Sequence, residues 1–174
     1  MSKHKDKIIN KLVNDLNAAD TEVVLNALSA IREKGNIQLI PTLIFKLLTT
    51  DVPEIKKELT LLFAELKDQA CVEPIMKAVN SDASIGNRHI LISTFWQSTL
   101  NGKAYFDDFI NHAISGDLAT CIECVSVIEH LAELNDEKII TDAIIKIKKT
   151  LSTPSEKSAL LMELIEMLQT RLME

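Results

Sequence analysis

The sequence predicts an all-α protein in which helices form pairs and the pairs stack on one another. Three observations support this fold class. An apolar pattern with helical spacing recurs along the chain with a period of 31 residues. An aspartate precedes each predicted pair. The 174 residues include only four Gly and four Pro, and aliphatic rather than aromatic side chains supply the apolar content.

The repeat is clearest in the second helix of each predicted pair. Four copies have apolar residues at positions i, i+3 and i+4, which lie on one face of an α-helix, and Leu12/Val13/Leu16 of the first helix match Leu43/Ile44/Leu47 one period later. A last step of 34 residues separates the final two copies. The copies are Leu12/Val13/Leu16, Ile44/Leu47/Leu48, Ile75/Ala78/Val79, Phe106/Phe109/Ile110 and Ile140/Ala143/Ile144. The first helices repeat as well, because Val24, Leu28 and Ile31 match Ile55, Leu59 and Leu62.

Helix starts are marked by polar side chains that can accept hydrogen bonds from free backbone N–H groups. The predicted N-cap residues are Asp20, Asp51, Asp82 and Asp117. Glu54 follows Asp51 by three residues, which is the pattern of a capping box. Thr153 and Glu156, with Pro154 between them, predict a stronger box for the last helix.

These signals predict ten helices, taken in chain order. They cover residues 4–17, 21–34, 37–49, 52–66, 69–80, 83–98, 103–114, 118–134, 137–151 and 154–172. We expect one domain over 1–174, with no linker or low-complexity tract. Its parts are a half-repeat at 4–19, pairs at 20–50, 51–81, 82–116 and 117–152, and a final helix at 153–174.

The order of an aspartate, a helix with a stripe of apolar residues along one face, a break, a proline and a second apolar helix resembles the HEAT-repeat family. In the first pair it includes Asp20, Gly35 and Pro41; in the second, Lys56 takes the place usually given to Arg, and Pro74 follows. The third and fourth pairs lack the proline. The resemblance implies a right-handed α-α superhelix, a HEAT-like solenoid of about four pairs with half-repeats at both ends. It says more about fold than about activity.

Composition excludes several classes of function. The net charge of −6 argues against nucleic acid as a partner, because phosphates require aligned Lys and Arg. No stretch approaches the roughly 18 apolar residues of a membrane span, and the start lacks the pattern of a secretory signal. Three Cys, an odd number, favour a reducing compartment. We therefore expect a cytoplasmic protein without cofactors.

Residues off the stripe of the second helices predict a binding surface. In a HEAT-like stack these helices line the concave side, so positions one period apart become neighbours. The candidate partner-binding residues are Phe45, Lys46, Met76, Lys77, Asp107, Asp108, Asn111 and Asp142. The hypothesis is a groove for a peptide or partner helix, apolar near Phe45 and Met76 and graded from basic to acidic. The alternative is that Phe45 and Met76 pack between repeats and the charges form a solvated face.

Other candidate sites are weaker. Trp96, adjacent to Phe95, is a possible aromatic hot spot if it is exposed, although a bulky core cluster explains it as well. Cys121 and Cys124 form a C-x-x-C, which we interpret as core residues rather than a metal or redox site. The four His are scattered, and no pattern of catalytic residues is present.

The sequence therefore favours a non-catalytic scaffold or adaptor that binds an unidentified protein. Three alternatives stay open. HEAT-like enzymes include DNA glycosylases for alkylated bases and bilin lyases, and only Trp96, Tyr105 and the Asp107–Asp108 pair could serve such chemistry. The last helix could pair with a second copy through Leu160, Met162 and Met167. The chain could also be a regulatory appendage of another protein.

Overall fold

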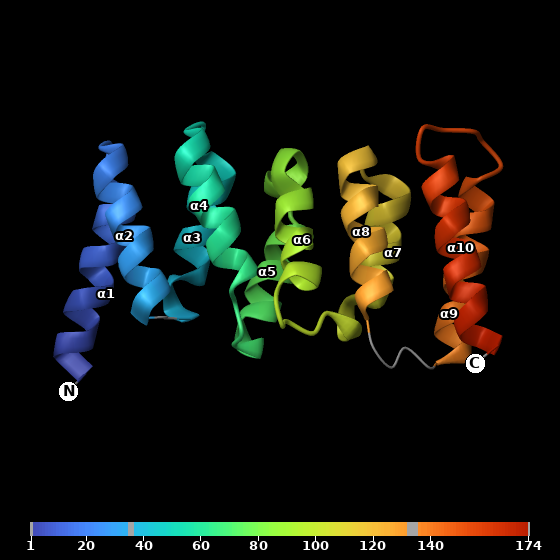
Figure 1. The fold of residues 1–174 in the computed structure, drawn as a ribbon, viewed down its shortest axis with the longest axis horizontal. Helices are drawn as coiled ribbons and strands as arrows, with labels where there is room; N and C mark the ends of the chain where they lie inside the picture. Colours follow the sequence, from blue (N-terminus) through green and yellow to red (C-terminus); the bar gives the residue numbers. More distant parts are fainter. Residues whose placement is uncertain (1, 35–36, 132–135, 174) are drawn as a thin grey trace. The chain divides into compact units, whose positions relative to one another are not determined.

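The chain folds into helices joined by turns and short links. The computed structural model describes residues 2–34, 37–131 and 136–173, and no β-strand occurs in these ranges (Figure 1). The α-helices are α1 Ser2–Leu16, α2 Thr21–Lys34, α3 Ile40–Thr49, α4 Pro53–Ala64, α5 Val72–Val79, α6 Arg88–Gln97, α7 Phe106–Ser115, α8 Leu118–His130, α9 Glu137–Thr150 and α10 Ser158–Met173. Short 3-10 turns, η1 Ile37–Leu39, η2 Gln69–Cys71, η3 Asp82–Asn87 and η4 Lys103–Tyr105, precede α3, α5, α6 and α7. The predicted all-α class is confirmed for these residues.

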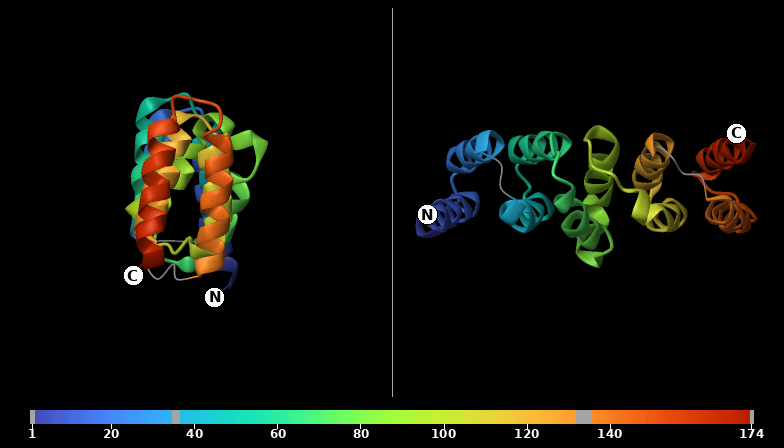
Figure 2. Two further views of the ribbon diagram at one scale, coloured as in Figure 1. Left: turned by 90° about the vertical axis from the view of Figure 1, so that its right-hand side faces the viewer. Right: turned by 90° about the horizontal axis from the view of Figure 1, so that it is seen from below.

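The helices belong to two compact units. Unit 1 contains Met1–Asn87 and Gln97–Leu100, and unit 2 contains Arg88–Trp96 and Asn101–Glu174. In unit 1, α1 packs on α2 and α3 packs on α4, while α1, α3 and α5 lie side by side in one layer and α2 and α4 in another (Figure 2). In unit 2, α7 packs on α8 and α9 on α10, with α7 beside α9 and α8 beside α10.

These contacts group the helices differently from the predicted pairs. The sequence placed helix 4–19 alone and paired α2 with α3, but α1 packs most closely on α2. The final helix likewise packs on α9 rather than standing alone. The repeat period is the same in both groupings. Longer links with 3-10 turns separate α2 from α3 and α4 from α5, whereas shorter links join α1 to α2 and α3 to α4, the helices that pack on each other. The period alone therefore does not define which two helices form a hairpin.

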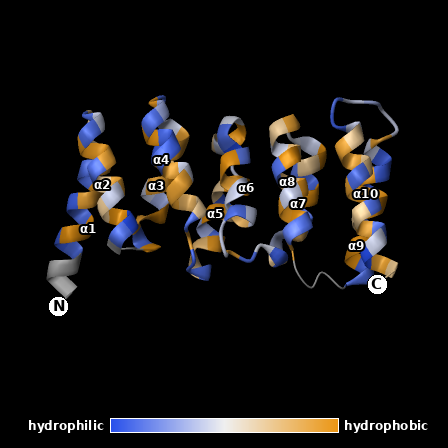
Figure 3. Ribbon diagram, viewed as in Figure 1, coloured by the Kyte–Doolittle hydropathy of each residue, from blue (hydrophilic) through white to orange (hydrophobic). Residues whose placement is uncertain are grey.

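The core of each unit is made by the predicted apolar stripes. Leu43, Ile44 and Leu47 of α3 are buried, and so are Phe106, Phe109 and Ile110 of α7. The first helices bury their own stripe, for example Ile55, Leu59 and Leu62 of α4. Apolar and polar residues alternate along the helices with this spacing (Figure 3). Burial of these aliphatic side chains is the main favourable term that holds the hairpins together.

The predicted N-caps are confirmed at two positions. The Asp20 carboxylate accepts a hydrogen bond from the Glu22 N–H at 2.8 Å, and Asp117 accepts from the Thr120 N–H at 2.8 Å. Hydrogen bonds from Thr120 hold the pKa of the Asp117 carboxyl below its ordinary value. Two further aspartates, Asp68 and Asp136, cap η2 and α9, and the sequence reading had not marked them.

The predicted capping at Asp51, Asp82 and Thr153 is wrong. Val52 is the N-cap of α4, without a side-chain hydrogen bond, and its N–H donates to the Thr50 hydroxyl instead. Asp82 lies inside η3, and Arg88 begins α6. The last helix begins at Ser158 rather than 154, because the Thr153 N–H continues the final turn of α9 by donating to the Thr150 carbonyl.

The predicted end of the first helix of the fourth pair, residues 118–134, is also wrong. Helix α8 ends at His130 because Leu131 adopts an extended backbone with φ −68° and ψ 106°, and residues 132–134 of the predicted helix lie outside the described residues. Within the described ranges, no helix is both long enough and apolar enough to span a membrane.

Candidate functional site

A groove between α7 and α9 is the candidate site in unit 2. It has a volume of about 510 Å³. Its lining comes from the start of α7, from the preceding turn and from the outer side of α9; the residues are Lys103, Ala104, Phe106, Asp107, Ile139, Asp142, Ile145 and Lys146. Asp107 and Asp142, two of the predicted surface residues, therefore line the same hollow.

The α7 side of the groove is fixed by Gly102. This residue lies against the rings of Phe95 and Phe109, which meet edge to face with centroids 5.3 Å apart. A Cβ atom at residue 102 would be 2.9 Å from Phe109 Cε2 and 3.0 Å from Phe95 Cδ1, so only glycine fits without displacing a ring. The Asn101 side chain accepts from the Lys103 N–H at 2.9 Å and starts the turn into α7. Lys103 and Phe106 are placed at the groove by this turn.

The α9 side of the groove depends on the cap at Asp136. Its carboxylate accepts hydrogen bonds from the Lys138 and Ile139 N–H groups at 3.0 and 3.1 Å. Helix α9 then buries Ile140, Ala143, Ile144 and Ile147. Because that stripe turns inward, Ile139 and Ile145 stay 43% and 47% exposed. Two isoleucines at the surface of one helix, beside a hollow, form an exposed apolar area whose contact with water is unfavourable.

The charged groups of the groove come from both helices. The Lys146 ammonium forms an ion pair with Asp107 Oδ1, and the Asn111 amide donates to Asp107 Oδ2 at 3.2 Å. This exposed pair contributes only about 0–1 kcal/mol to stability. Asp142 is exposed one helical turn before Lys146. Asn111, another predicted surface residue, thus supports Asp107 rather than lining the hollow.

Asp108 points to a different environment from Asp107. It is half-buried, and its charge acts on His112, one turn later on α7. Burial lowers the pKa of His112, the Arg88 guanidinium lowers it further, and Asp108 opposes both. Asp108 therefore belongs to a small charged cluster of α6 and α7 and does not line the groove.

The predicted surface residues of unit 1 separate into exposed and buried ones. Phe45 is 60% exposed on α3, Lys46 is half-buried beside it, and Lys77 is exposed on α5. Met76 is only 1% exposed, so its expected place on the same surface as Phe45 is wrong. Position 76 is equivalent to 45 by period, but α5 has only eight residues after its 3-10 turn and buries Ile75 and Met76 together.

The aromatic residues of α6 are divided between core and surface. Phe95 is buried, and Trp96 is half-buried. The Trp96 indole N–H donates to Glu123 Oε2 at 2.6 Å, and the His130 ring lies 5.9 Å from the Trp96 ring between centroids. The indole N–H thus has a partner inside the unit, and a role of Trp96 in binding stays a prediction.

The three cysteines are free and buried. Burial raises the pKa of the Cys121 and Cys124 thiols, and it also raises that of Cys71. Neutral, buried thiols are poor nucleophiles and poor metal ligands. Among the residues described, no group of three His, Cys, Asp or Glu could hold a metal ion.

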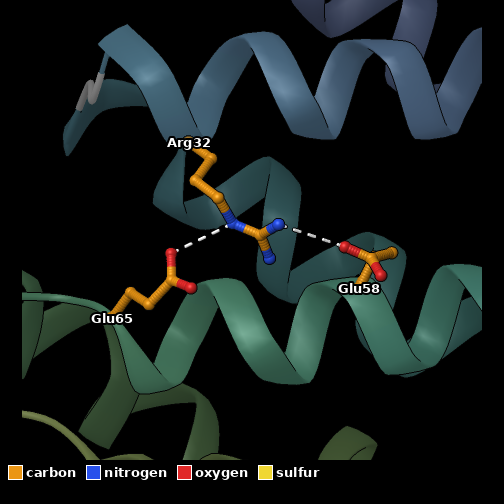
Figure 4. Close-up of polar contacts among 3 residues, drawn as sticks. All are labelled: Arg32, Glu58 and Glu65. Carbon is orange, nitrogen blue, oxygen red and sulfur yellow. Dashed lines mark hydrogen bonds and ion pairs between the residues drawn. The ribbon is translucent and has the colours of Figure 1, made fainter.

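A second hollow of about 610 Å³ lies in unit 1, at the junction of α2, α3 and α4. Most of its wall is core, including Ile31, Leu43 and Leu62. At its edge, Arg32 Nε lies 3.0 Å from Glu65 Oε2, and Arg32 Nη1 lies 3.2 Å from Glu58 Oε2 (Figure 4). The guanidinium joins α2 to Glu58 of α4 and to Glu65, the residue that follows α4, so the polar groups here serve the packing of two helices.

The candidate binding residues from the sequence did not include the other six groove residues, which are Lys103, Ala104, Phe106, Ile139, Ile145 and Lys146. Ile139 had a usable signal, because it is apolar and lies off the stripe formed by Ile140, Ala143 and Ile144. Lys146 had none, since its ion pair joins residues 39 apart.

Comparison with known proteins gives no relative. No protein-family model matches the chain, and no curated protein or solved structure matches it.

Proposed function

We propose that this chain is a HEAT-like α-solenoid that serves as a non-catalytic scaffold and binds a peptide or partner helix in the groove between α7 and α9. One observation carries the proposal: two half-exposed isoleucines and the exposed Asp142 surround a hollow of about 510 Å³. The repeat period and the buried stripes support the solenoid.

The apolar side chains supply the affinity in this proposal. Ile139 and Ile145 expose 43% and 47% of their surface, so covering each one contributes roughly 1 kcal/mol at the usual value per unit of apolar area. Two such contacts alone correspond to weak binding, because association also costs translational and rotational freedom. The partner must therefore add contacts with other exposed residues of the groove, such as Lys103 and Ala104.

The charges determine which partner fits. Asp107 already pairs with Lys146, whereas Asp142 is exposed at the groove wall. A basic side chain on the partner would meet Asp142 and orient the segment. The proposed partner is therefore a short apolar segment with a Lys or Arg near its apolar residues. If it is helical, its apolar anchors are expected at i, i+3 or i+4, and i+7.

We also propose that the protein is located in a reducing compartment such as the cytoplasm. The support is chemical: three free thiols are a normal state where disulfides are kept reduced. Binding, not catalysis, is proposed because the groove presents exposed apolar side chains, and its one printed charged pair, Asp107 and Lys146, is an exposed surface ion pair.

The test is selection of peptides from a displayed random library on the immobilised chain, followed by affinity measurements with fluorescent peptides. We expect enriched peptides to contain two apolar residues at helical spacing and one basic residue. Ile145→Glu should weaken them at least about 10-fold, which corresponds to about 1.4 kcal/mol, since the apolar contact is lost and a charge is placed against the apolar residues of the peptide. Asp142→Lys should weaken peptides that carry the basic residue.

The matched control is Lys149→Glu, which reverses an exposed charge on α9 outside the groove lining. It should leave the affinity unchanged. Selected peptides that bind the Ile145→Glu variant as well as the original chain would show that the groove is not the binding site. Circular dichroism of each variant checks that the fold is retained.

A further inference from the structure

The hollow at the junction of α2, α3 and α4 has a largely apolar lining. Its volume is about 610 Å³, and all of its lining residues belong to unit 1. The aliphatic part of the lining comes from three helices, the turn η1 and the link that follows α4; the residues are Ile31, Ile37, Ile40, Leu43, Leu62 and Leu66. A concave, mostly apolar hollow of this size is typical of sites that bind small molecules.

The apolar surface that a ligand can cover lies at the mouth of the hollow. Ile37 is 36% exposed, and Leu66 is half-buried. The other four aliphatic residues are each 5% exposed or less, so they present only their outermost atoms and form a close-packed floor. A ligand would therefore lie between Ile37 and Leu66 and rest on this floor.

The link between α4 and α5 is held in place beside the hollow. The Asp68 carboxylate accepts a hydrogen bond from the Ala70 N–H at 3.0 Å, and the Cys71 N–H donates to the Asp68 carbonyl at 2.9 Å. The Gln69 amide donates to the Thr99 carbonyl at 2.8 Å. These hydrogen bonds fix the wall that the link contributes, so a ligand would not have to order it on binding.

The charges of the lining cancel. They are two cations, Arg32 and Lys67, and two anions, Glu65 and Asp68. Arg32 already bridges Glu65 and Glu58 (Figure 4). An ionised ligand would lose hydration on entering the hollow and would meet no excess of opposite charge in the lining, which is unfavourable. An uncharged molecule has no such cost.

We propose that this hollow binds a small uncharged apolar molecule, which packs against Ile37 and Leu66. Because the lining belongs to α2, α3 and α4, an occupied hollow joins three helices, and its ligand stabilises the native state. The site is separate from the α7–α9 groove and does not depend on the function proposed for that groove.

The test is fluorescence titration with two probes that share the same rings and become brighter in apolar surroundings. Phenylnaphthylamine is uncharged, whereas anilinonaphthalene sulfonate adds one negative charge. The uncharged probe should bind in a saturable way, and the sulfonate should bind the same site at least about 10-fold more weakly. Saturating uncharged probe should also raise the melting temperature, because it binds the native state.

Variants of the mouth locate the site of binding. Ile37→Asp places a charge beside the ligand and should weaken the uncharged probe at least about 10-fold; Leu66→Asn should act in the same direction. The matched control is Leu61→Asp, at a residue of α4 that is 44% exposed and outside the lining. Ile145→Glu, in the α7–α9 groove, should also leave the affinity unchanged and so separates the two sites.

Circular dichroism of each variant checks that the helices are retained. Three results would overturn the proposal: no saturable binding of the uncharged probe, equal affinity of the original chain and both mouth variants, or a sulfonate that binds as tightly as the uncharged probe.

Discussion

Gly102 shows how one absent side chain positions a helix. It lies against two phenyl rings, from α6 and α7, whose planes meet at 65°. The close approach of backbone and rings is possible only without a Cβ. The same turn presents Lys103 and Phe106 to the groove, so the packing of this residue and the shape of the candidate site are linked.

Replacing Gly102 with Ala should therefore destabilise the protein. The new methyl group would overlap Phe109 and Phe95, and overpacking of this kind costs about 1–3 kcal/mol. For a chain of this size the expected fall in melting temperature is about 3–10 °C, measured by calorimetry. Gly86→Ala is the control, because nothing lies within 4 Å of its added Cβ. Equal stability of the two variants would contradict the tight packing at residue 102.

His112 links stability to pH. Its pKa is lowered in the folded protein, first by burial and then by Arg88, relative to its ordinary value of 6.5. The unfolded chain therefore binds the proton more readily, and the associated stability is present above the unfolded pKa and declines as pH falls below it. In His112→Gln this part of the pH dependence should disappear.

The measurement is the melting temperature of both proteins at about pH 7.5 and about pH 5.5, on either side of the ordinary histidine pKa. The decrease on acidification should be smaller for His112→Gln than for the original chain. His130→Gln, at an exposed histidine, is the control. An unchanged pH dependence in His112→Gln would show that His112 does not titrate in this way.

At the scale of elements, two basic side chains of unit 2 hold the ends of other helices. The Lys157 ammonium donates to the carbonyls of Ala113, Ile114 and Gly116 at 3.2, 2.5 and 2.6 Å, at the end of α7. Arg171 of α10 donates to the carbonyls of Ile128, Glu129 and Leu131 at the end of α8. Cations are favoured there, because the last carbonyls lack partners and carry the negative end of the helix dipole.

Lys157→Met keeps the length of the side chain and removes these hydrogen bonds. We expect a loss of about 1–3 kcal/mol in the free energy of unfolding, since half-buried carbonyls lose a charged donor. Urea denaturation measures it. Lys149→Met, which removes an exposed lysine of α9, should change stability by less than about 0.5 kcal/mol. If both variants were equally stable, Lys157 would not cap α7.

These helix-end contacts also explain why part of the structure was beyond sequence reasoning. Thr153, Pro154 and Glu156 satisfy the local rules for a helix start, yet α10 begins at Ser158. Lys157, just before it, donates to carbonyls 41–44 residues earlier in the chain, and no local pattern predicts such a contact. Local patterns predicted well what depends on local physics: the stripes of α3 and α7 and the caps at Asp20 and Asp117.

At the scale of the whole molecule, the repeat predicted the fold class and only part of the candidate site. Asp107 and Asp142 line one groove because α7 and α9 lie side by side, although by the 34-residue step Asp142 is equivalent to Asp108 rather than to Asp107. The rule that equivalent positions share a surface failed for Met76, where the shorter α5 turns the equivalent position inward.

The reach of Lys157 has a consequence for the order in which the protein matures during translation. A ribosome that has just completed α7 has not yet made Lys157, which comes 41 residues after Gly116. Until that lysine leaves the exit tunnel, the three carbonyls at the end of α7 lack the donor that they have in the folded protein. The end of α7 therefore gains these hydrogen bonds only after the link to α10 emerges.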